Sequence, residues 1–270
     1  MCATCGCGSD EAGVTVVGDQ PEHHRHPHGD DGPGHHHGPG HHHDDHVDGD
    51  LRTHTLEIEE LVLAKNDHLA GHNREWLRDR GITALNVMSS PGAGKTTLLE
   101  RTISESPVPV GVIEGDQETL IDAERIRAAG ARAVQINTGS GCHLDAAMVA
   151  RALTSLDPAD GSLLIIENVG NLVCPALFDL GERWRVVVIS VTEGDDKPLK
   201  YPHMFAAADL VVVNKTDLLP YVDFDLERLR KLAGQVNPGV EVMPLSARTG
   251  DGLQAWRDWL AGGRVASTVL

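Results

Sequence analysis

Three of the chain's five cysteines, Cys2, Cys5 and Cys7, lie within its first seven residues. Thiolates this close together, beside a terminal amine, offer a set of soft metal ligands that needs no folded scaffold. A disulfide between two of them would leave one thiol over, and the rest of the chain shows no disulfide framework. We therefore favour a metal site over a disulfide or three ordinary surface cysteines, and we expect a planar Ni²⁺ complex with one nitrogen and three sulfur ligands.

A histidine-rich tract, interspersed with Gly, Pro and Asp, follows these cysteines. Its members are His23, His24, His26, His28, His35, His36, His37, His41, His42, His43 and His46. Tracts of this composition are typical of weak, exchangeable binding of nickel, zinc or copper. A purification tag, the alternative, is usually one unbroken run. Because residues 8–50 contain almost no apolar side chains, the sequence predicts a disordered metal-binding arm over residues 1–54, followed by a folded domain over residues 55–270.

A phosphate-binding loop is predicted at residues 89–97 (SSPGAGKTT), between a short apolar run and a helix-like segment. Glycines let backbone amides turn toward phosphates, and the following helix adds the partial positive charge of its amino end. Lys95 is expected to reach the β- and γ-phosphates, and Thr96 to bind Mg²⁺. Ser89 occupies the position at which the motif usually has its first glycine. The residues expected to hold the nucleotide phosphates are Gly92, Ala93, Gly94, Lys95, Thr96 and Thr97.

A base-selecting motif, NKTD at residues 214–217, follows another apolar run. An ionised Asp217 can accept hydrogen bonds from N1–H and the exocyclic amine of guanine, whereas adenine has an acceptor at N1 and would leave the carboxylate unpaired. Such a motif is weak alone but specific after a phosphate-binding loop, so the base is predicted to be guanine. The residues expected to hold this base are Asn214, Lys215, Asp217, Ser246 and Ala247.

Two acidic residues could act on Mg²⁺ from the ends of predicted strands. Glu167 follows the apolar run at residues 163–166, although Asp is more familiar at this place, and Asp116 follows the second run, at residues 110–113. A solvated loop acid or a helix cap is the alternative for Asp116. Gly170, three residues after Glu167, could donate its amide to the γ-phosphate. The loop after it would then respond to GTP hydrolysis.

The remaining two cysteines lie in two other loops, Cys142 beside His143 and Cys174 four residues after Gly170. Buried free cysteine is common as a small apolar filler, which is the alternative for each thiol alone. In a doubly wound sheet, however, both loops belong to the carboxyl edge where a nucleotide binds. Two thiolates and one imidazole there form an incomplete zinc or nickel site that lacks a fourth ligand.

Apolar runs and helix-like segments alternate along the rest of the chain, after an amphipathic helix predicted at residues 55–79. Strands are predicted at 84–88, 110–113, 132–136, 163–166, 185–191, 210–213 and 241–245. Helices are predicted near 95–105, 119–129, 144–156, 223–235 and 252–261. Strands that alternate with helices form a mostly parallel sheet with helices on both faces, so the predicted fold class is α/β.

The overall charge and hydropathy exclude several classes of protein. A formal net charge of −17 argues against binding of nucleic acid or of a membrane surface, because a phosphate backbone attracts basic proteins. No stretch of 18 apolar residues and no secretory signal is visible. Unpaired thiols without an export signal favour the cytoplasm.

Together these motifs resemble the HypB family of nickel-incorporation GTPases in hydrogenase maturation. The resemblance rests on the amino-terminal CxxCGC, the histidine-rich arm, SSPGAGKTTLLE, VIEGDQET, INTGSGCHLDA, ENVGNLVCPALFDLGE and NKTDLLP. It implies a P-loop GTPase fold, slow GTP hydrolysis, a homodimer favoured by GTP, and nickel delivery to the large subunit of [NiFe]-hydrogenase. It also implies a HypA-type zinc/nickel metallochaperone as partner.

The resemblance further implies that the amino-terminal cysteines form a high-affinity nickel site. It places Cys142, His143 and Cys174 in a weaker site at the dimer interface. Three alternatives remain at this point: the related GTPase of urease maturation, a metal-storage protein that uses its GTPase domain for dimerisation, and a GTP-dependent small-molecule kinase. The ligands alone do not separate Ni²⁺ from Zn²⁺. They also leave open whether the arm stores, buffers or loads nickel.

Overall fold

The computed structural model describes residues 13–16, 48–116, 121–138 and 141–262. The side chains of residues 13–16, 48–59, 116 and 121–123 are not part of this description. The cysteines predicted to bind metal at the amino terminus and the histidine-rich tract lie outside the described residues.

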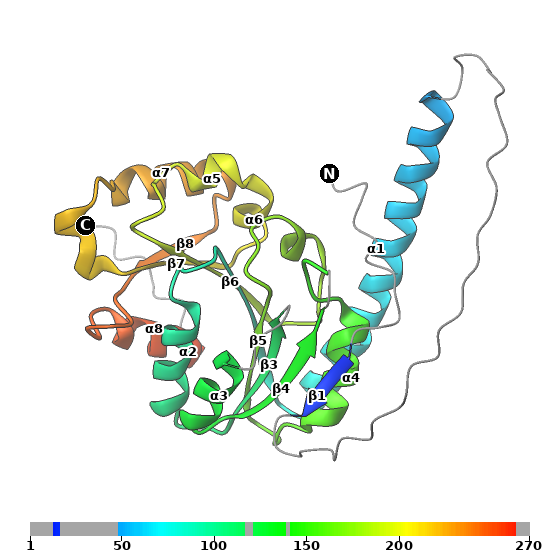
Figure 1. The fold of residues 1–270 in the computed structure, drawn as a ribbon, viewed down its shortest axis with the longest axis horizontal. Helices are drawn as coiled ribbons and strands as arrows, with labels where there is room; N and C mark the ends of the chain where they lie inside the picture. The colour runs from blue at the N-terminus through cyan, green and yellow to red at the C-terminus, as the bar shows by residue number, and fades with distance from the viewer. Residues whose placement is uncertain (1–12, 17–47, 117–120, 139–140, 263–270) are drawn as a thin grey trace, which may run out of the picture.

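An eight-stranded sheet is the centre of the described chain (Figure 1). Seven strands run parallel to their neighbours, and only the edge strand β1 pairs antiparallel, with β4. In spatial order the strands are β1 (Gly13–Val16), β4 (Arg132–Asn137), β3 (Val110–Asp116), β5 (Leu163–Glu167), β2 (Thr83–Ser89), β6 (Trp184–Ser190), β7 (Leu210–Asn214) and β8 (Glu241–Pro244). The central strands are buried runs of aliphatic side chains, as expected for parallel strands covered on both faces.

Helices cover both faces of this sheet, which confirms the predicted fold class. One face packs against α2 (Lys95–Ser104), α3 (Ile121–Ala128) and α8 (Leu253–Leu260). The other face packs against α1 (Asp48–Asp79), α4 (Ala146–Leu156), α6 (Pro202–Ala206) and α7 (Leu226–Val236). Shorter helical segments are η1 (Cys174–Leu177), α5 (Lys197–Lys200) and η2 (Thr216–Tyr221). No helix among the described residues has the length and apolar character needed to cross a bilayer.

The structure extends the predicted elements at the amino-terminal side. The helix predicted from residue 55 begins at Asp48, and β1 lies within the stretch expected to have no structure. This strand is only four residues long, and its pairing with the edge of β4 depends on residues about 120 positions away. Local sequence pattern contains no signal for such a long-range contact.

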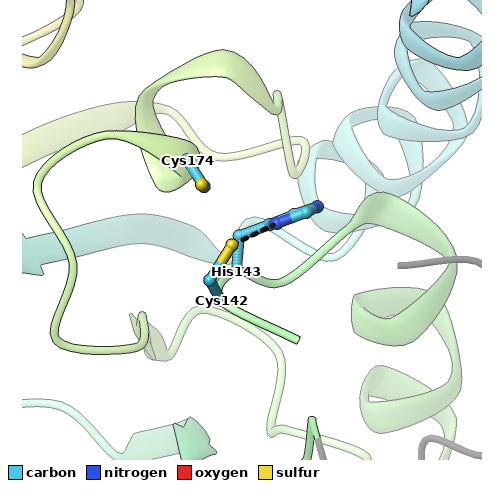
Figure 2. Close-up of side chains that lie close together, drawn as sticks. All are labelled: Cys142, His143 and Cys174. Carbon is cyan, nitrogen blue, oxygen red and sulfur yellow. Dashed lines mark hydrogen bonds between the residues drawn. The ribbon is translucent and has the colours of Figure 1, made fainter. Parts of the chain in front are cut away.

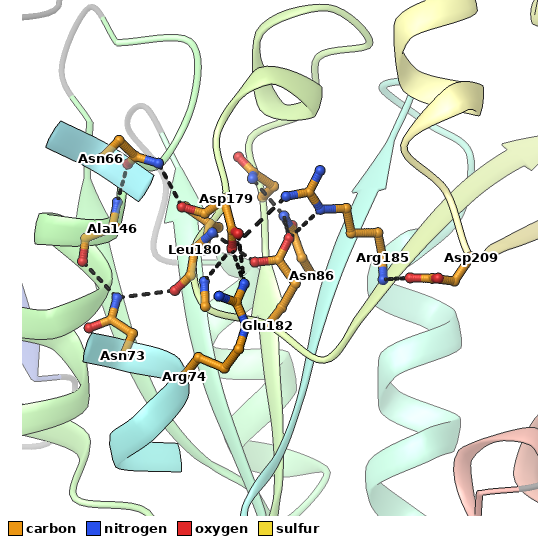
Figure 3. Close-up of polar contacts among 12 residues, drawn as sticks. Asn66, Asn73, Arg74, Asn86, Ala146, Asp179, Leu180, Glu182, Arg185 and Asp209 are labelled. Carbon is orange, nitrogen blue, oxygen red and sulfur yellow. Dashed lines mark hydrogen bonds and ion pairs between the residues drawn. The ribbon is translucent and has the colours of Figure 1, made fainter. Parts of the chain in front are cut away.

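Polar side chains fasten α1 to the rest of the domain (Figure 3). Asn66 donates to the Asp179 carbonyl at 2.8 Å and accepts from the Ala146 amide at 2.9 Å. Asn73 donates to the carbonyls of Ala146 at 2.9 Å and Leu180 at 3.0 Å. Both amide side chains are buried, so these bonds satisfy groups that would otherwise be costly to bury. They fix the start of α4 relative to the segment that follows η1.

A second set of contacts continues from this segment into the sheet. Arg74 of α1 binds the Asp179 carboxylate at 2.6 and 2.7 Å. The buried Glu182 accepts from the side chains of Arg185 at 2.6 Å and Asn86 at 3.3 Å (Figure 3). Glu182 also accepts from the Leu180 amide at 2.7 Å. The loop between β5 and β6 is therefore anchored to both α1 and β2 at the end that precedes β6.

Candidate nucleotide and metal sites

The predicted phosphate-binding loop lines a cavity of about 340 Å³ at the carboxyl edge of the sheet. All six residues expected to hold the phosphates contribute to it, together with Glu167 and Gly170. The lining residues are Ser89, Ser90, Pro91, Gly92, Ala93, Gly94, Lys95, Thr96, Thr97, Glu114, Gly115, Arg125, Glu167 and Gly170. The position, between β2 and α2, is where a strand–loop–helix unit offers backbone amides to an anion.

Two glycines shape this loop, as the sequence predicts. Gly92 has a φ of 74° and Gly94 a φ of 91°, in the left-handed region that favours glycine. A Cβ on Gly94 would also lie 2.5 Å from the Asn214 side-chain nitrogen. Ser89, in place of the familiar first glycine, is the last residue of β2 and pairs in register with Val188. A serine is compatible with this position because it is ordinary strand.

Lys95 and Thr96 meet the end of β5 inside the cavity. The Lys95 amine donates to the Asn168 carbonyl at 2.5 Å and lies 3.4 Å from a Glu167 carboxylate oxygen. The Thr96 hydroxyl donates to the same carboxylate at 3.5 Å. A hydroxyl next to a carboxylate is a hard oxygen pair of the kind that Mg²⁺ prefers, so these residues fit that ion. Asp116, the other predicted Mg²⁺ partner, ends β3, and its side chain is not described.

The residues predicted to hold the base converge on the same loop from the other side. Asn214 donates to the Ala93 carbonyl at 2.9 Å and accepts from the amides of Lys215 at 2.7 Å and Ala247 at 3.0 Å. Lys215 donates to the Gly92 carbonyl at 2.6 Å. These bonds connect the ends of β7 and β8 to the phosphate-binding loop, so the loop and the base-binding segment form one unit.

Asp217 itself is oriented by a neighbour. The Ser246 hydroxyl donates to a carboxylate oxygen of Asp217 at 2.6 Å and accepts from the Thr249 amide at 3.1 Å. This arrangement fixes the direction of the carboxylate within the structure, as preorganisation of a binding group requires. The sequence predicts that Ser246 is one of the residues that hold the base. The structure adds a role for its side chain.

The second predicted site is also assembled by the fold. The ligand atoms of Cys142, His143 and Cys174 lie within 4.8 Å of one another, and all three residues are half-buried (Figure 2). Among the residues that the structure describes, no other three His, Cys, Asp or Glu side chains are grouped in this way. The Cys142 sulfur lies 3.6 Å from the His143 Nδ1. Cys142 lies in the turn before α4 and Cys174 at the start of η1, and neither forms a disulfide bond.

The surroundings of His143 favour its metal-binding form. Its ring stacks on Phe178 with centroids 4.0 Å apart. Burial lowers the pKa of His143, and the nearby Asp145 carboxylate opposes this effect. The net lowered pKa keeps the imidazole neutral, with a lone pair available to a metal. Two sulfurs and one nitrogen leave zinc or nickel with an incomplete ligand set.

Asn168 connects the two sites, a role that sequence reasoning did not assign. Its carbonyl accepts from Lys95, while its side-chain oxygen accepts from the Leu144 amide at 3.3 Å, one residue beyond His143. Its side-chain nitrogen donates to Asn86 at 3.3 Å. Asn168 is completely buried. Asn168 therefore connects Lys95 to the Cys142–His143 turn, through its backbone carbonyl on one side and its side chain on the other.

A further cavity, of about 400 Å³, lies between the phosphate-binding loop and the metal-ligand loops. Pro91, Cys142 and Gly170 all line it. In addition, the Asn171 side chain donates to the Cys142 carbonyl at 3.4 Å. The loop that begins at Gly170 thus contacts the nucleotide cavity at one end and the thiol cluster at the other.

Two more cavity residues were not among the predicted site residues. Glu114 pairs in register with Glu167 on the adjacent strand, and both carboxylates are buried. Arg125 of α3 lines the phosphate cavity and binds Glu100 of α2 at 2.8 and 2.9 Å. The register of two parallel strands and the approach of one helix to another have no local sequence motif, so neither residue could be identified from the sequence pattern.

Comparisons with known proteins give one consistent result. Residues 83–244 match the CobW/HypB/UreG nucleotide-binding domain family. The hydrogenase maturation factor HypB of Escherichia coli (strain K12) is 47% identical, over 98% of this chain and 100% of its own length. The crystal structure of hydrogenase maturation factor HypB from Archaeoglobus fulgidus has a TM-score of 0.69 and 46% identity, covering 74% of this chain and 98% of that one. The crystal structure of HypB from Helicobacter pylori in complex with nickel has a TM-score of 0.69 and 40% identity. It covers 73% of this chain and 94% of that one.

Proposed function

Because the chain belongs to the HypB family of hydrogenase maturation factors, we propose that it is a GTP-hydrolysing nickel metallochaperone. Its cargo would be Ni²⁺ for the large subunit of [NiFe]-hydrogenase. The observation that carries the proposal is the loop from Glu167 to Cys174. This loop lines the phosphate cavity at Gly170 and supplies a thiol to the metal-ligand cluster.

In the proposed reaction, the phosphate-binding loop holds the β- and γ-phosphates of GTP and Lys95 exchanges its contact with Asn168 for the phosphates. Asp217, oriented by Ser246, would select guanine. Mg²⁺, held by Thr96 and Glu167 with Asp116 as a further partner, would neutralise charge on the phosphates. A water oxygen bonds to the γ-phosphorus while the bond to the β–γ bridging oxygen breaks, which gives GDP and phosphate.

Hydrolysis would change the metal site through two connections. The Gly170 amide would lose its γ-phosphate contact, and the loop to Cys174 would be released. Return of the Lys95 contact to Asn168 would act on the Cys142–His143 turn through Leu144. Nickel held by these ligands would then be handed onward when GTP is consumed.

The homodimer in this proposal follows from the incomplete ligand set, and the metallochaperone partner follows from the resemblance to the HypB family. A homodimer favoured by GTP would complete the coordination of Cys142, His143 and Cys174, which could hold Ni²⁺ or Zn²⁺. Cys2, Cys5 and Cys7 would form a separate nickel site, and a HypA-type metallochaperone would exchange metal with the protein. The protein would act in the cytoplasm, where thiols remain reduced.

Complementation of cells that lack the corresponding maturation factor tests the proposal. The full chain should restore [NiFe]-hydrogenase activity, whereas Lys95→Ala and Cys174→Ala should not, and added nickel should partly rescue the loss. Restoration by the amino-terminal arm alone would instead support the storage alternative. Restoration of urease but not of hydrogenase would assign the protein to the other maturation pathway.

A further inference from the structure

A pair of histidines on α1 lies outside both sites described above. His68 and His72 are one helical turn apart, and both are exposed to solvent. Their Nε2 atoms lie 3.2 Å from each other, and the two rings meet edge to face with centroids 4.7 Å apart. Neither ring is needed for packing, because the buried face of this helix carries Asn66, Ala70 and Asn73.

The distance between the two nitrogens suits a shared metal ion. Nitrogen ligands bind zinc at about 2.0–2.1 Å. Two such bonds to atoms 3.2 Å apart enclose an angle of about 100° at the metal. This value lies between the right angle of square-planar or octahedral coordination and the tetrahedral angle. Because both side chains are exposed, rotation of the rings can direct both lone pairs toward the same ion without any change in the backbone.

The same helix face carries a carboxylate one turn further on, although its oxygens do not lie within 4.8 Å of both histidine nitrogens. Glu75 follows His72 by three residues, a spacing that places the two side chains on one face of a helix. Its carboxylate is exposed and belongs to the next turn. Two imidazoles with water form a donor set that suits Ni²⁺, Cu²⁺ or Zn²⁺ and leaves positions open for exchange.

We propose that His68 and His72 form an exchangeable transition-metal site on the exposed face of α1. The helix begins at Asp48, directly after the histidine-rich tract in the sequence, and its buried face contacts Ala146, three residues after His143. The site therefore lies on the element that joins the tract to the domain with the thiol cluster. It would hold Ni²⁺ or Zn²⁺ transiently, and its existence does not depend on GTP hydrolysis.

Histidine footprinting of the full chain can test this site despite the many other histidines. Diethyl pyrocarbonate acylates free imidazole nitrogens, and a bound metal protects them. Cleavage after Lys65 and Arg74 releases a peptide, residues 66–74, whose only histidines are His68 and His72. Cleavage after Lys200 and Lys215 releases residues 201–215, whose only histidine, His203, is exposed and serves as the control. Labelling is measured against free Ni²⁺ or Zn²⁺ fixed by a chelator buffer.

We expect half-protection of residues 66–74 at a free Ni²⁺ concentration at least about tenfold lower than for His203, because two linked ligands bind more tightly than one. In the His68→Gln variant, protection of His72 should require as much free Ni²⁺ as protection of His203. Circular dichroism of this variant should show an intact helix. The single variant Lys95→Ala, which keeps both histidines, should keep the protection, and this separates the proposal from the GTPase function. Equal protection of His72 in the wild type and in His68→Gln, or equal protection of both peptides, would overturn it.

Discussion

Asn168 shows how a single residue can serve two sites at once. Its backbone contacts the phosphate-binding lysine, and its side chain supports the turn that carries Cys142 and His143. The contact with Lys95 is made by the backbone and does not depend on the side chain, whereas the contacts with Leu144 and Asn86 do. A substitution at this position can therefore separate nucleotide binding from its effect on the metal ligands.

We predict that Asn168→Ala retains GTP binding but reduces the difference in nickel affinity between the GDP-bound and GTP-analogue-bound states. Loss of bonds to Leu144 and Asn86 leaves buried polar groups unpaired, at a cost of about 1–3 kcal/mol in the free energy of unfolding. Nickel titrations in both nucleotide states measure the first effect, and urea unfolding measures the second.

Asn237→Ala is a matched control for this experiment. Asn237 also bonds to backbone groups, donating to the carbonyls of Phe205, Ala206 and Ala208, but it lies outside both sites. The variant should lose stability and keep the full nucleotide dependence of nickel affinity. If Asn168→Ala also keeps that dependence, the coupling does not pass through this side chain.

The base-selecting residues give a second prediction at this scale. Lys95→Ala should abolish GTP turnover, because the cation that faces the phosphates is lost. Asp217→Asn should weaken GTP binding and improve binding of xanthosine triphosphate, whose base offers an acceptor where guanine offers a donor. Ser246→Ala should cause a smaller loss for GTP, because only the orientation of the carboxylate changes. Binding constants for GTP, xanthosine triphosphate and ATP measure these effects, and efficient ATP hydrolysis would contradict the assignment of guanine.

The site residues that could be predicted from the sequence are those in motifs that tolerate few residue types. A phosphate-binding loop allows few residue types, and the structure brings its predicted members together around one cavity. Asn168 lies in the segment ENVGNLVCPALFDLGE, which contributes to the family resemblance, but its partners Leu144 and Asn86 are 24 and 82 positions away. An asparagine that follows a strand can form hydrogen bonds of many kinds. Only the fold shows which one applies here.

At the scale of elements, α1 is the structural support of the metal-ligand loops. It contacts the start of α4 and the segment 179–182 through amide side chains and the Arg74–Asp179 ion pair (Figure 3). Gly181 allows the close approach, since a Cβ at this position would lie 2.8 Å from the Ala70 carbonyl. Its φ of 93° also favours glycine. These features place the helix by tertiary contacts rather than by its weak amphipathic pattern.

The ion pair predicts a pH dependence of stability. Burial disfavours the charged Asp179 carboxylate, but the Arg74 guanidinium and the Gly181 amide outweigh this and lower its pKa. A carboxylate whose pKa is lower in the folded state contributes stability above its unfolded pKa of about 3.9, and this contribution is lost as the pH falls toward the folded value. Asp179→Asn should therefore destabilise the protein at pH 7 and progressively less on acidification.

Urea unfolding of wild type and Asp179→Asn at a series of pH values measures this effect. The ion-pair contribution should not exceed about 1 kcal/mol, because the Arg74 side chain is 47% exposed. Asp79→Asn provides a control, since its carboxylate is 71% exposed at the end of the same helix. A difference between wild type and Asp179→Asn that grows on acidification would contradict the prediction.

The elements themselves were largely predictable, and the exceptions have a common cause. Buried parallel strands appear in the sequence as aliphatic runs, and the seven predicted strands are all present. The structure adds β1, α5 and α6, which are four or five residues long. Elements this short are held by their neighbours, so the sequence within them contains little information about their structure.

At the scale of the whole molecule, an exposed apolar surface lies beside the proposed metal site. Val173 and Leu177 flank Cys174 in sequence and are 48% and 50% exposed. A formal charge of −17 favours attraction of divalent cations over association between like-charged copies. Local apolar contact and a shared metal ion could offset that repulsion. The proposed dimer would then form where its ligand set is completed.

We predict that Leu177→Asp weakens dimerisation in the GTP-analogue state and lowers nickel affinity at Cys142, His143 and Cys174. A charge on this surface would be buried on association and would repel its copy across a symmetric interface. Val108→Asp is a matched control, because Val108 is 41% exposed but precedes β3, at the opposite edge of the sheet from the metal site.

Sedimentation measurements with GDP or a non-hydrolysable GTP analogue, with and without Ni²⁺, distinguish the outcomes. Binding linkage requires that a metal which favours the dimer is itself bound more tightly by the dimer, by the same factor. Wild type and Val108→Asp should therefore dimerise more strongly when nickel and the GTP analogue are both present, and Leu177→Asp should not. Unchanged dimerisation of Leu177→Asp would place the interface elsewhere, and the three ligands would then need completion by water or by another protein.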